Sequence, residues 1–330
     1  MLFQGEDNMV QYTYLNKNRS NAIKGLLIII IVLGHNHILA PGTTVHGMRD
    51  YLYQFHVQAF FILPFFYQKK FEVSWKHICD VLVRNWVPYF WVCLLCYVTL
   101  SFTNHHFNFS WGYVMAFING TQSPLKHYFG FVFPWFLPTY CSLYILFLLA
   151  SKYRWFYWVL LVLSLFTWTM TWADYYVLKT TIPFGIGLAL GFFAYGVITF
   201  HLNKYSYTIK YVGLLIFIFL TVGYWVDMSI PYTEHMFPIS FFLSVLCIAP
   251  CLNCKWLCLL GENSLGIYMF HVFFVNLYCL IFPENLVNGL ISFVVSLIIS
   301  LVITLIINRY DITKHLCFPR SWRDICNLKK

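Results

Sequence analysis

The sequence predicts an all-α protein, a polytopic membrane helix bundle of about ten transmembrane helices with both termini in the cytoplasm. Its residues are 60% hydrophobic and only 10% charged, whereas soluble domains carry about 25% charged residues. A soluble chain this apolar would not have enough polar side chains to cover its surface. Apolar stretches long enough to cross a bilayer recur along the chain between short polar segments. The distribution of basic residues among those segments sets the orientation.

The expected helices are separated by clusters of polar residues, glycine and proline. In chain order they cover residues 22–40, 51–68, 86–103, 133–151, 155–175, 182–200, 211–227, 236–252, 261–282 and 287–308. The segment 104–132 is predicted to be a long loop that holds a short interfacial helix. We expect no cleavable signal peptide, because the first 21 residues are polar and lack a short apolar core.

Basic residues are concentrated on one side of this arrangement. With the N-terminus inside, only Arg49, Lys126 and Lys179 of the 21 lysines and arginines face outward, in line with the positive-inside rule. The net charge of +9 is therefore a topology signal and not evidence for nucleic-acid binding. The predicted parts are a cytoplasmic N-terminal segment (1–21), a membrane domain (22–308) and a basic cytoplasmic tail (309–330).

The eleven cysteines lie mostly in apolar segments, where cysteine acts as a small hydrophobic residue. Cys247, Cys251, Cys254 and Cys258 are spaced four, three and four residues apart, which would align them on one helix face. Pro250 interrupts that helix. We therefore expect no bound metal.

The first expected helix carries a histidine. The apolar run 22–34 contains Lys24 and leads to His35, eleven residues after the lysine, or about 16 Å of helix rise. That distance is roughly half of the ~30 Å hydrocarbon thickness, so His35 is predicted at mid-depth. Ionisable groups at this depth are costly and usually functional. The alternative is a packing histidine with a satisfied hydrogen bond.

Four local patterns accompany this histidine. They are Ala22-Ile23-Lys24-Gly25 leading to Leu33-Gly34-His35, Tyr53-Gln54-Phe55-His56, Arg84-Asn85-Trp86-Val87-Pro88-Tyr89 with Pro134-Trp135-Phe136-Leu137-Pro138, and Leu260-Gly261-Glu262-Asn263-Ser264-Leu265-Gly266-Ile267-Tyr268 followed by His271. In this order and spacing the chain, from about residue 17 to 308, resembles the acyltransferase-3 family of membrane-bound O-acyltransferases. Within that family it is most similar to the sugar O-acetylases related to fucose 4-O-acetylase.

The resemblance implies transfer of an acyl group, usually acetyl from acetyl-CoA, to a hydroxyl of a glycan or lipid-linked sugar. The essential histidine of the family falls on His35, and its basic residue, usually arginine, falls on Lys24. Lysine lacks the bidentate fork of arginine. The family pattern His-Met-Pro reads His56-Val57-Gln58 here, a departure on the expected acceptor side. A larger acyl group than acetyl is the alternative.

The predicted catalytic residues are His35, Lys24, His56 and Tyr268, and the predicted donor-binding residues are Lys24, Arg84, Trp135 and His271. A histidine has an unperturbed pKa of about 6.5 and can take the proton of an acceptor hydroxyl. The candidate partners of the His35 ring are Asn36, His37, His56 and Tyr268. The cationic residues suit the phosphates of acetyl-CoA.

Each of these residues also has a structural interpretation. Lys24 is alternatively a snorkelling anchor, Arg84 a marker of the inner face and Trp135 an interfacial aromatic residue. His56 and His271 are alternatively packing residues.

A second class of function is a secondary transporter or flippase for a sugar or organic anion. The sequence shows no internal repeat and no acidic residue deep in an expected helix, so the enzyme is favoured over the transporter. The recurrent histidines favour it over a non-catalytic scaffold. The expected location is the bacterial cytoplasmic membrane. Acetyl-CoA, the glycan acceptor and membrane lipid are the expected partners.

Overall fold

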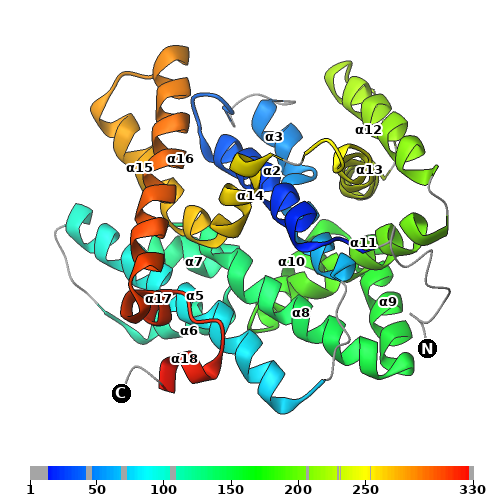
Figure 1. Cartoon of the computed structure of the whole chain (residues 1–330), viewed down its shortest axis with the longest axis horizontal. Coiled ribbons are helices and arrows are strands. Elements are labelled where there is room, and N and C mark those ends of the chain that lie inside the picture. Colours follow the sequence, from blue (N-terminus) through cyan, green and yellow to red (C-terminus); the bar gives the residue numbers. More distant parts are fainter. Residues whose placement is uncertain are drawn as a thin grey trace. The chain divides into compact units, whose positions relative to one another are not determined.

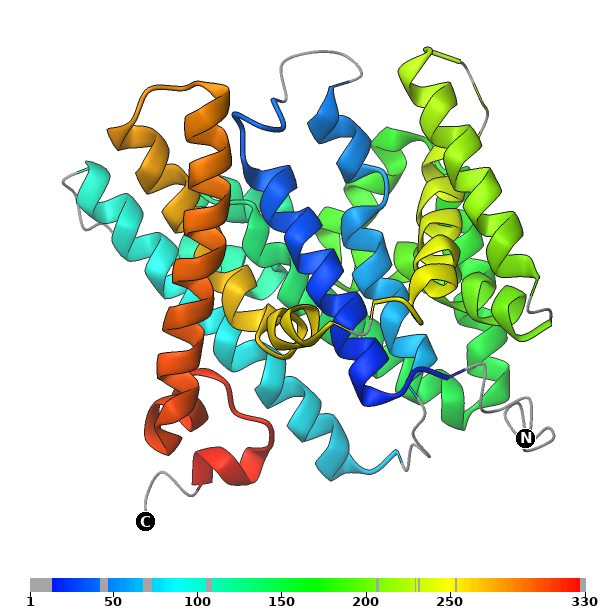
Figure 2. The ribbon, with the colours of Figure 1, turned by 45° about the horizontal axis from the view of Figure 1, so that its top comes forward.

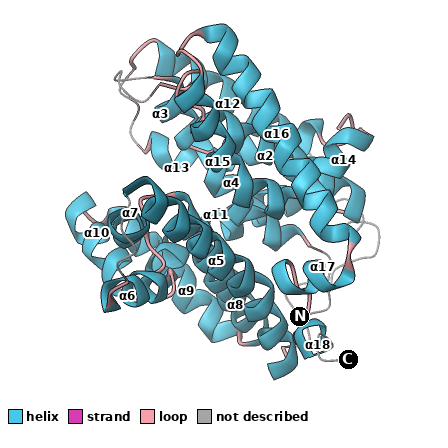
Figure 3. Ribbon diagram, turned by 90° about the vertical axis from the view of Figure 1, so that its left-hand side faces the viewer, coloured by secondary structure: helices cyan, strands magenta, loops and turns pink. Residues whose placement is uncertain are grey.

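The described part of the chain is helical. The computed structural model describes residues 14–41, 47–67, 73–104, 109–205, 208–228, 230, 232–252 and 254–326. Within these ranges no strand is present (Figure 3), and the one β-bridge joins Leu15 to Tyr67. The all-α prediction is confirmed for this part of the chain.

The helices form two units. The first comprises residues 1–69 and 195–306, and the second comprises 70–194 and 307–330. The helix α11 (Ile186–Tyr205) begins in the second unit and ends in the first.

The first unit is built around α2, which packs against α14, α15, α3 and α4. Figures 1 and 2 show α2 crossing α14, and α12 beside α13. The elements of the first unit are α2 (Lys17–His35), α3 (Met48–Tyr53), α4 (His56–Ile62), η1 (Leu63–Phe66), α12 (Ile209–Trp225), α13 (Thr233–Ile248), α14 (Lys255–Glu262), α15 (Ser264–Ile281) and most of α16 (Leu286–Arg309).

The second unit is centred on the pair α5 and α8, with α9 against α8 and α7 against α5. The predicted basic tail forms two short helices on α5: the indole of Trp91 donates to the carbonyl of Leu316, and the Trp322 amide donates to Asp80. The elements of the second unit are α5 (Trp75–Asn104), α6 (Trp111–Asn119), α7 (Gln122–Phe129), η2 (Phe133–Trp135), α8 (Phe136–Lys152), α9 (Arg154–Thr169), α10 (Trp172–Thr181), the first half of α11, α17 (Asp311–Cys317) and α18 (Trp322–Cys326).

Five of these helices are long and apolar enough to cross a membrane, among the described residues. They are Trp75–Thr103, Phe133–Lys152, Ile186–Tyr205, Ser264–Ile281 and Leu286–Arg309. The helices α12 and α13 are apolar but shorter. Membrane helices are thus supported, and the count of ten spans stays a prediction.

Several predicted helix boundaries were wrong. The expected helix 51–68 is interrupted between α3 and α4 and ends as a 3₁₀ turn containing Pro64. The expected helix 155–175 breaks after Thr169, and the Thr171 hydroxyl accepts from the Asp174 amide to cap α10. The expected helix 86–103 begins at Trp75 and not at residue 86. The charged residues before Arg84 resembled a loop, but they form the first turns of α5.

The predicted loop 104–132 contains helix, as expected, although it holds two helices, α6 and α7, among its described residues. The histidines at 105 and 106 lie outside the described residues.

The helix α2 ends at His35, the predicted general base. The expected helix 22–40 stops at His35, because the side-chain oxygen of Asn36 accepts the amides of Ile38 and Leu39, both at 3.1 Å. Asparagine commonly ends a helix in this way by forming a local turn. The result places His35 at the helix terminus, followed by a fully buried amide side chain.

Two glycines allow α2 and α14 to cross at backbone distance. A Cβ added to Gly25 would lie 2.0 Å from the carbonyl oxygen of Leu257. One added to Gly261 would lie 1.8 Å from the carbonyl oxygen of Asn21. Small residues at such crossings are typical of packed membrane helices. This contact gives a physical reason for the Gly25 of the first sequence pattern and the Gly261 of the fourth.

We therefore expect Gly25→Ala or Gly261→Ala to lower the free energy of unfolding by about 1–3 kcal/mol or more, the usual cost of overpacking. The backbone oxygen in each contact cannot move without shifting a helix. Gly34→Ala is the matched control on the same helix, since its Cβ would meet side chains at 3.7–3.8 Å, an ordinary contact. Thermal unfolding in detergent measures the difference. Equal melting temperatures for all three variants would contradict the close crossing.

Candidate active site

Two histidines from distant parts of the sequence meet in the first unit. The Nδ1 atom of His35 lies 2.7 Å from Nε2 of His271, and the two rings stack with centroids 5.0 Å apart. His35 ends α2, and His271 lies in the second turn of α15. His271 is fully buried and His35 is partly exposed. The sequence patterns predicted both residues but did not predict their contact.

The partners of these rings determine where the protons lie. The Nδ1 atom of His271 is 3.0 Å from the carbonyl oxygen of Ile267. A carbonyl can only accept, so this Nδ1 donates, and in the neutral ring Nε2 is then an acceptor. His35 must therefore donate from Nδ1 to His271. In neutral His35 the remaining nitrogen, Nε2, carries a lone pair, and among the described residues it makes no hydrogen bond.

The side chains of Asn36 and His37 contact partners other than the His35 ring. The amide of Asn36 donates to the carbonyl of Gly289 at 3.0 Å and to the hydroxyl of Ser292 at 2.7 Å, both on α16. His37 lies 3.2 Å from a carboxylate oxygen of Glu284. Both had been candidate partners of the His35 ring; instead, Asn36 ties the end of α2 to α16.

His56 and Tyr53 lie beside the same helix end. The His56 side chain is fully buried, and its Nδ1 lies 2.6 Å from the carbonyl oxygen of Leu52. The Tyr53 ring contacts the rings of both His56 and His35, with centroid distances of 4.6 and 6.3 Å. The guanidinium of Arg49 lies 5.5 Å from the centroid of the same Tyr53 ring.

Lys24 and Tyr268 lie on α2 and α15, the two helices that carry the histidine pair. Lys24 is partly buried on α2, and eleven residues make close to three helical turns, so it shares a face with His35. Tyr268 is buried on α15, with its ring centroid 5.9 Å from that of His271. Tyr268 therefore contacts the partner of His35 by its ring.

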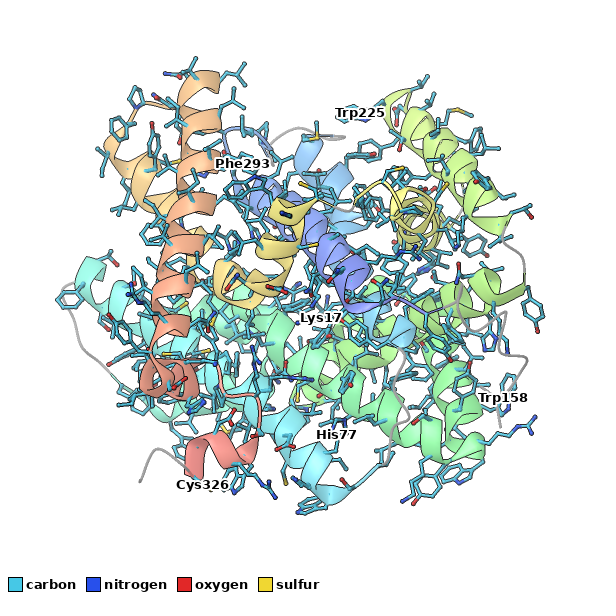
Figure 4. All side chains as sticks on the ribbon, viewed as in Figure 1. Lys17, His77, Trp158, Trp225, Phe293 and Cys326 are labelled. Atoms are coloured by element: carbon cyan, nitrogen blue, oxygen red, sulfur yellow. The ribbon has the colours of Figure 1, made fainter. Side chains whose placement is uncertain are left out.

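The fourth sequence pattern fixes α14 and α15 around α2. The amide of Asn21 donates to Glu262 at 3.0 Å. Lys17, labelled in Figure 4 at the N-terminal end of α2, lies 4.0 Å from the same carboxylate. A Cβ on Gly266 would lie 2.2 Å from the hydroxyl of Thr304 on α16. These contacts join α14 to the first turns of α2 and bring α15 close to α16.

Arg84 and Trp135 belong to the second unit. The guanidinium of Arg84 lies 5.6 Å from the ring centroid of Tyr144. The ring of Trp135 stacks on that of Phe192 at 6.2 Å. Their predicted roles in donor binding stay predictions, as does that of His271. Within the described ranges, no group of three or more histidine, cysteine, aspartate or glutamate side chains is arranged to hold a metal ion.

Tyr53 and Ser292 were missed as site residues. Tyr53 is the first residue of the second sequence pattern, three residues before His56, and its place in that pattern was a usable signal. Ser292 gave no such signal, because it is one of several buried serines of α16, with Ser296 and Ser300.

The chain matches the profile of an acyltransferase domain, acyltransferase-3, over residues 18–309. This confirms the family that the four patterns resemble. No curated protein sequence and no solved structure gives a significant match. The match covers the whole of the site described above, including both histidines. The chain therefore belongs to the acyltransferase-3 family and is a membrane acyltransferase.

Proposed function

We propose that the protein transfers an acetyl group from acetyl-CoA to a hydroxyl of a cell-surface or lipid-linked saccharide, with His35 as general base. The observation that supports this most is the hydrogen bond from His35 to His271, which leaves the lone pair of His35 Nε2 available. A ring held in this tautomer at a helix end is suited to removing a proton. The acceptor class follows the likeness to the sugar O-acetylases.

The proposed step is a single acyl transfer. The acceptor oxygen attacks the thioester carbonyl carbon while its proton passes to His35 Nε2. The new carbon–oxygen bond forms, the carbon–sulfur bond breaks, and the departing thiolate takes the proton from the imidazolium. The His271 ring stabilises that imidazolium by accepting its Nδ1–H. His271 is thus a positioning residue in this proposal.

Lys24 is proposed to bind the phosphates of the donor. The eleven residues between Lys24 and His35 correspond to about 16 Å along α2, a distance that an extended pantetheine arm can span. Phosphates near Lys24 would place the thioester near His35. Acetyl-CoA is proposed to enter from the cytoplasm.

We expect Lys24→Ala to raise the KM for acetyl-CoA about 10-fold or more, the loss of one charge-assisted contact. Lys24→Arg keeps the charge and should retain part of the donor affinity. Lys17→Ala is the matched control, since that lysine lies on the same helix and is exposed. Donor titrations with purified protein measure the effect. An unchanged KM in Lys24→Ala would show that the lysine is only an anchor.

Donor entry from the cytoplasm requires the predicted topology. Ser123→Cys, in the predicted outer loop, and Ser151→Cys, beside the predicted inner Lys152, place small probes at exposed positions. On a background without the eleven native cysteines, an impermeant thiol reagent applied to intact cells should label position 123 and not position 151. The opposite labelling would move the donor to the outer face and remove the role of Lys24.

Mass spectrometry of surface glycans tests the function in the cell. Cells that carry the gene should show a mass increment of one acetyl group per modified sugar, and cells without it should not. Identical spectra would contradict the proposal, and a larger increment would identify a larger acyl group.

A further inference from the structure

His56 presents a buried nitrogen with no partner in the described part of the chain. Its Nδ1 lies 2.6 Å from the carbonyl oxygen of Leu52, so Nδ1 donates and Nε2 carries the lone pair. This Nε2 is buried and makes no hydrogen bond. The reverse tautomer would set two lone pairs against each other at 2.6 Å. Buried polar atoms of this kind are uncommon and call for an explanation.

The Nε2 atom of His56 lies beside Gly34, the residue before the proposed base His35. A Cβ added to Gly34, the residue before His35, would lie 3.8 Å from His56 Nε2 and 3.7 Å from the Tyr53 ring. Because the Tyr53 ring contacts both imidazoles, their centroids lie within about 11 Å of each other, the sum of the two centroid distances. Two imidazole nitrogens with free lone pairs therefore lie beside one helix end.

We propose that His56 Nε2 accepts a hydrogen bond from a second hydroxyl of the acyl acceptor. This inference rests on the proposed function and adds to it a second contact with the acceptor. An atom that only accepts is satisfied by a hydroxyl and not by a carboxylate or phosphate oxygen, which carries no proton. With His35 taking the proton of the reacting hydroxyl, an acceptor that reaches both nitrogens carries at least two hydroxyls. The acceptor is then a sugar or polyol and not a simple alcohol.

The experiment compares acceptors and variants together. Purified protein receives acetyl-CoA and a panel of methyl glycosides, each with its monodeoxy analogues, and release of coenzyme A is measured. In the wild type, loss of one hydroxyl other than the acylated one should lower kcat/KM by about 10–100-fold, as expected when a buried acceptor loses its partner. In His56→Phe the parent glycoside should lose a similar factor, and parent and analogue should become equal.

Two further variants keep the test decisive. His56→Gln places an acceptor oxygen near the same position and should retain part of the discrimination, which covers the case in which the phenylalanine variant does not fold. Gln58→Leu is the matched control: it removes another buried oxygen, two residues along α4, that has no hydrogen-bond partner among the described residues, and it should keep the wild-type discrimination.

The results separate this inference from the function on which it rests. If the wild type releases coenzyme A but the His56 variants discriminate between parent and deoxy acceptors as the wild type does, the hydroxyl subsite is wrong and the acyltransferase stands. If the wild type does not discriminate at all, the subsite is also wrong. If no acceptor supports release by the wild type, both the function and the subsite fall.

Discussion

His35→Ala is expected to lower the rate of acyl transfer by about 10²–10⁴-fold, the usual contribution of a general base. The variant removes the one atom of the histidine pair whose lone pair is available, Nε2 of His35. Because His35 is the last residue of α2, the helix itself should persist. Release of coenzyme A in the presence of acceptor measures the rate, and thermal unfolding confirms that the variant is folded.

The adjacent histidine provides the control. His37→Ala removes an imidazole that lies against Glu284 and does not contact His271. It should retain most of the wild-type rate. A folded His35→Ala protein that transfers acyl groups at a near-normal rate would remove His35 from the mechanism. Equal losses in the two variants would point to a general effect of disturbing the end of α2.

The second large effect is expected at His271. His271→Phe keeps an aromatic ring in the same buried space but cannot accept the proton of His35 Nδ1, so the reactive tautomer is no longer fixed. Losing the group that fixes the catalytic histidine lowers kcat by about 10⁴-fold in serine proteases. A neutral imidazole stabilises an imidazolium less than the carboxylate of those proteases does, so we expect a smaller loss of about 10²–10³-fold here.

A positioning role predicts a particular kinetic pattern. His271→Phe should lower kcat and leave the KM values for donor and acceptor nearly unchanged, because His271 contacts neither substrate in the proposed step. His271→Gln restores an acceptor oxygen and should recover part of kcat. A raised KM for acetyl-CoA with normal kcat would instead support the sequence-based prediction that His271 binds the donor.

The sequence indicated candidate site residues but not their contacts. His35 and His271 stood out because each follows a recognisable pattern, and both lie in the site. Their hydrogen bond was not predicted, because 236 residues separate them and only the packing of α15 on α2 brings them together. Asn36 was a candidate partner by adjacency, but its side chain ends the helix and bonds to α16.

Helix boundaries failed where local hydrogen bonds compete with hydrophobic continuity. The apolar residues after His37 favour a continued helix, yet the turn formed by Asn36 ends it. The segment from Tyr51 to Gln68 is almost as apolar as a span, but it turns between α3 and α4. The glycines at 25 and 261 were visible in the patterns, whereas the backbone crossing that requires them depends on tertiary packing.

The most direct test of the account couples thioester cleavage to ester formation. Purified protein in lipid nanodiscs, given acetyl-CoA labelled in the acetyl group together with a glycan acceptor, should release coenzyme A and form labelled acetyl ester in equal amounts. Release should require the acceptor and should be lost in His35→Ala. A folded wild-type protein that binds the acceptor but releases no more coenzyme A than His35→Ala would contradict the assignment of His35 as the base of an acyl transfer.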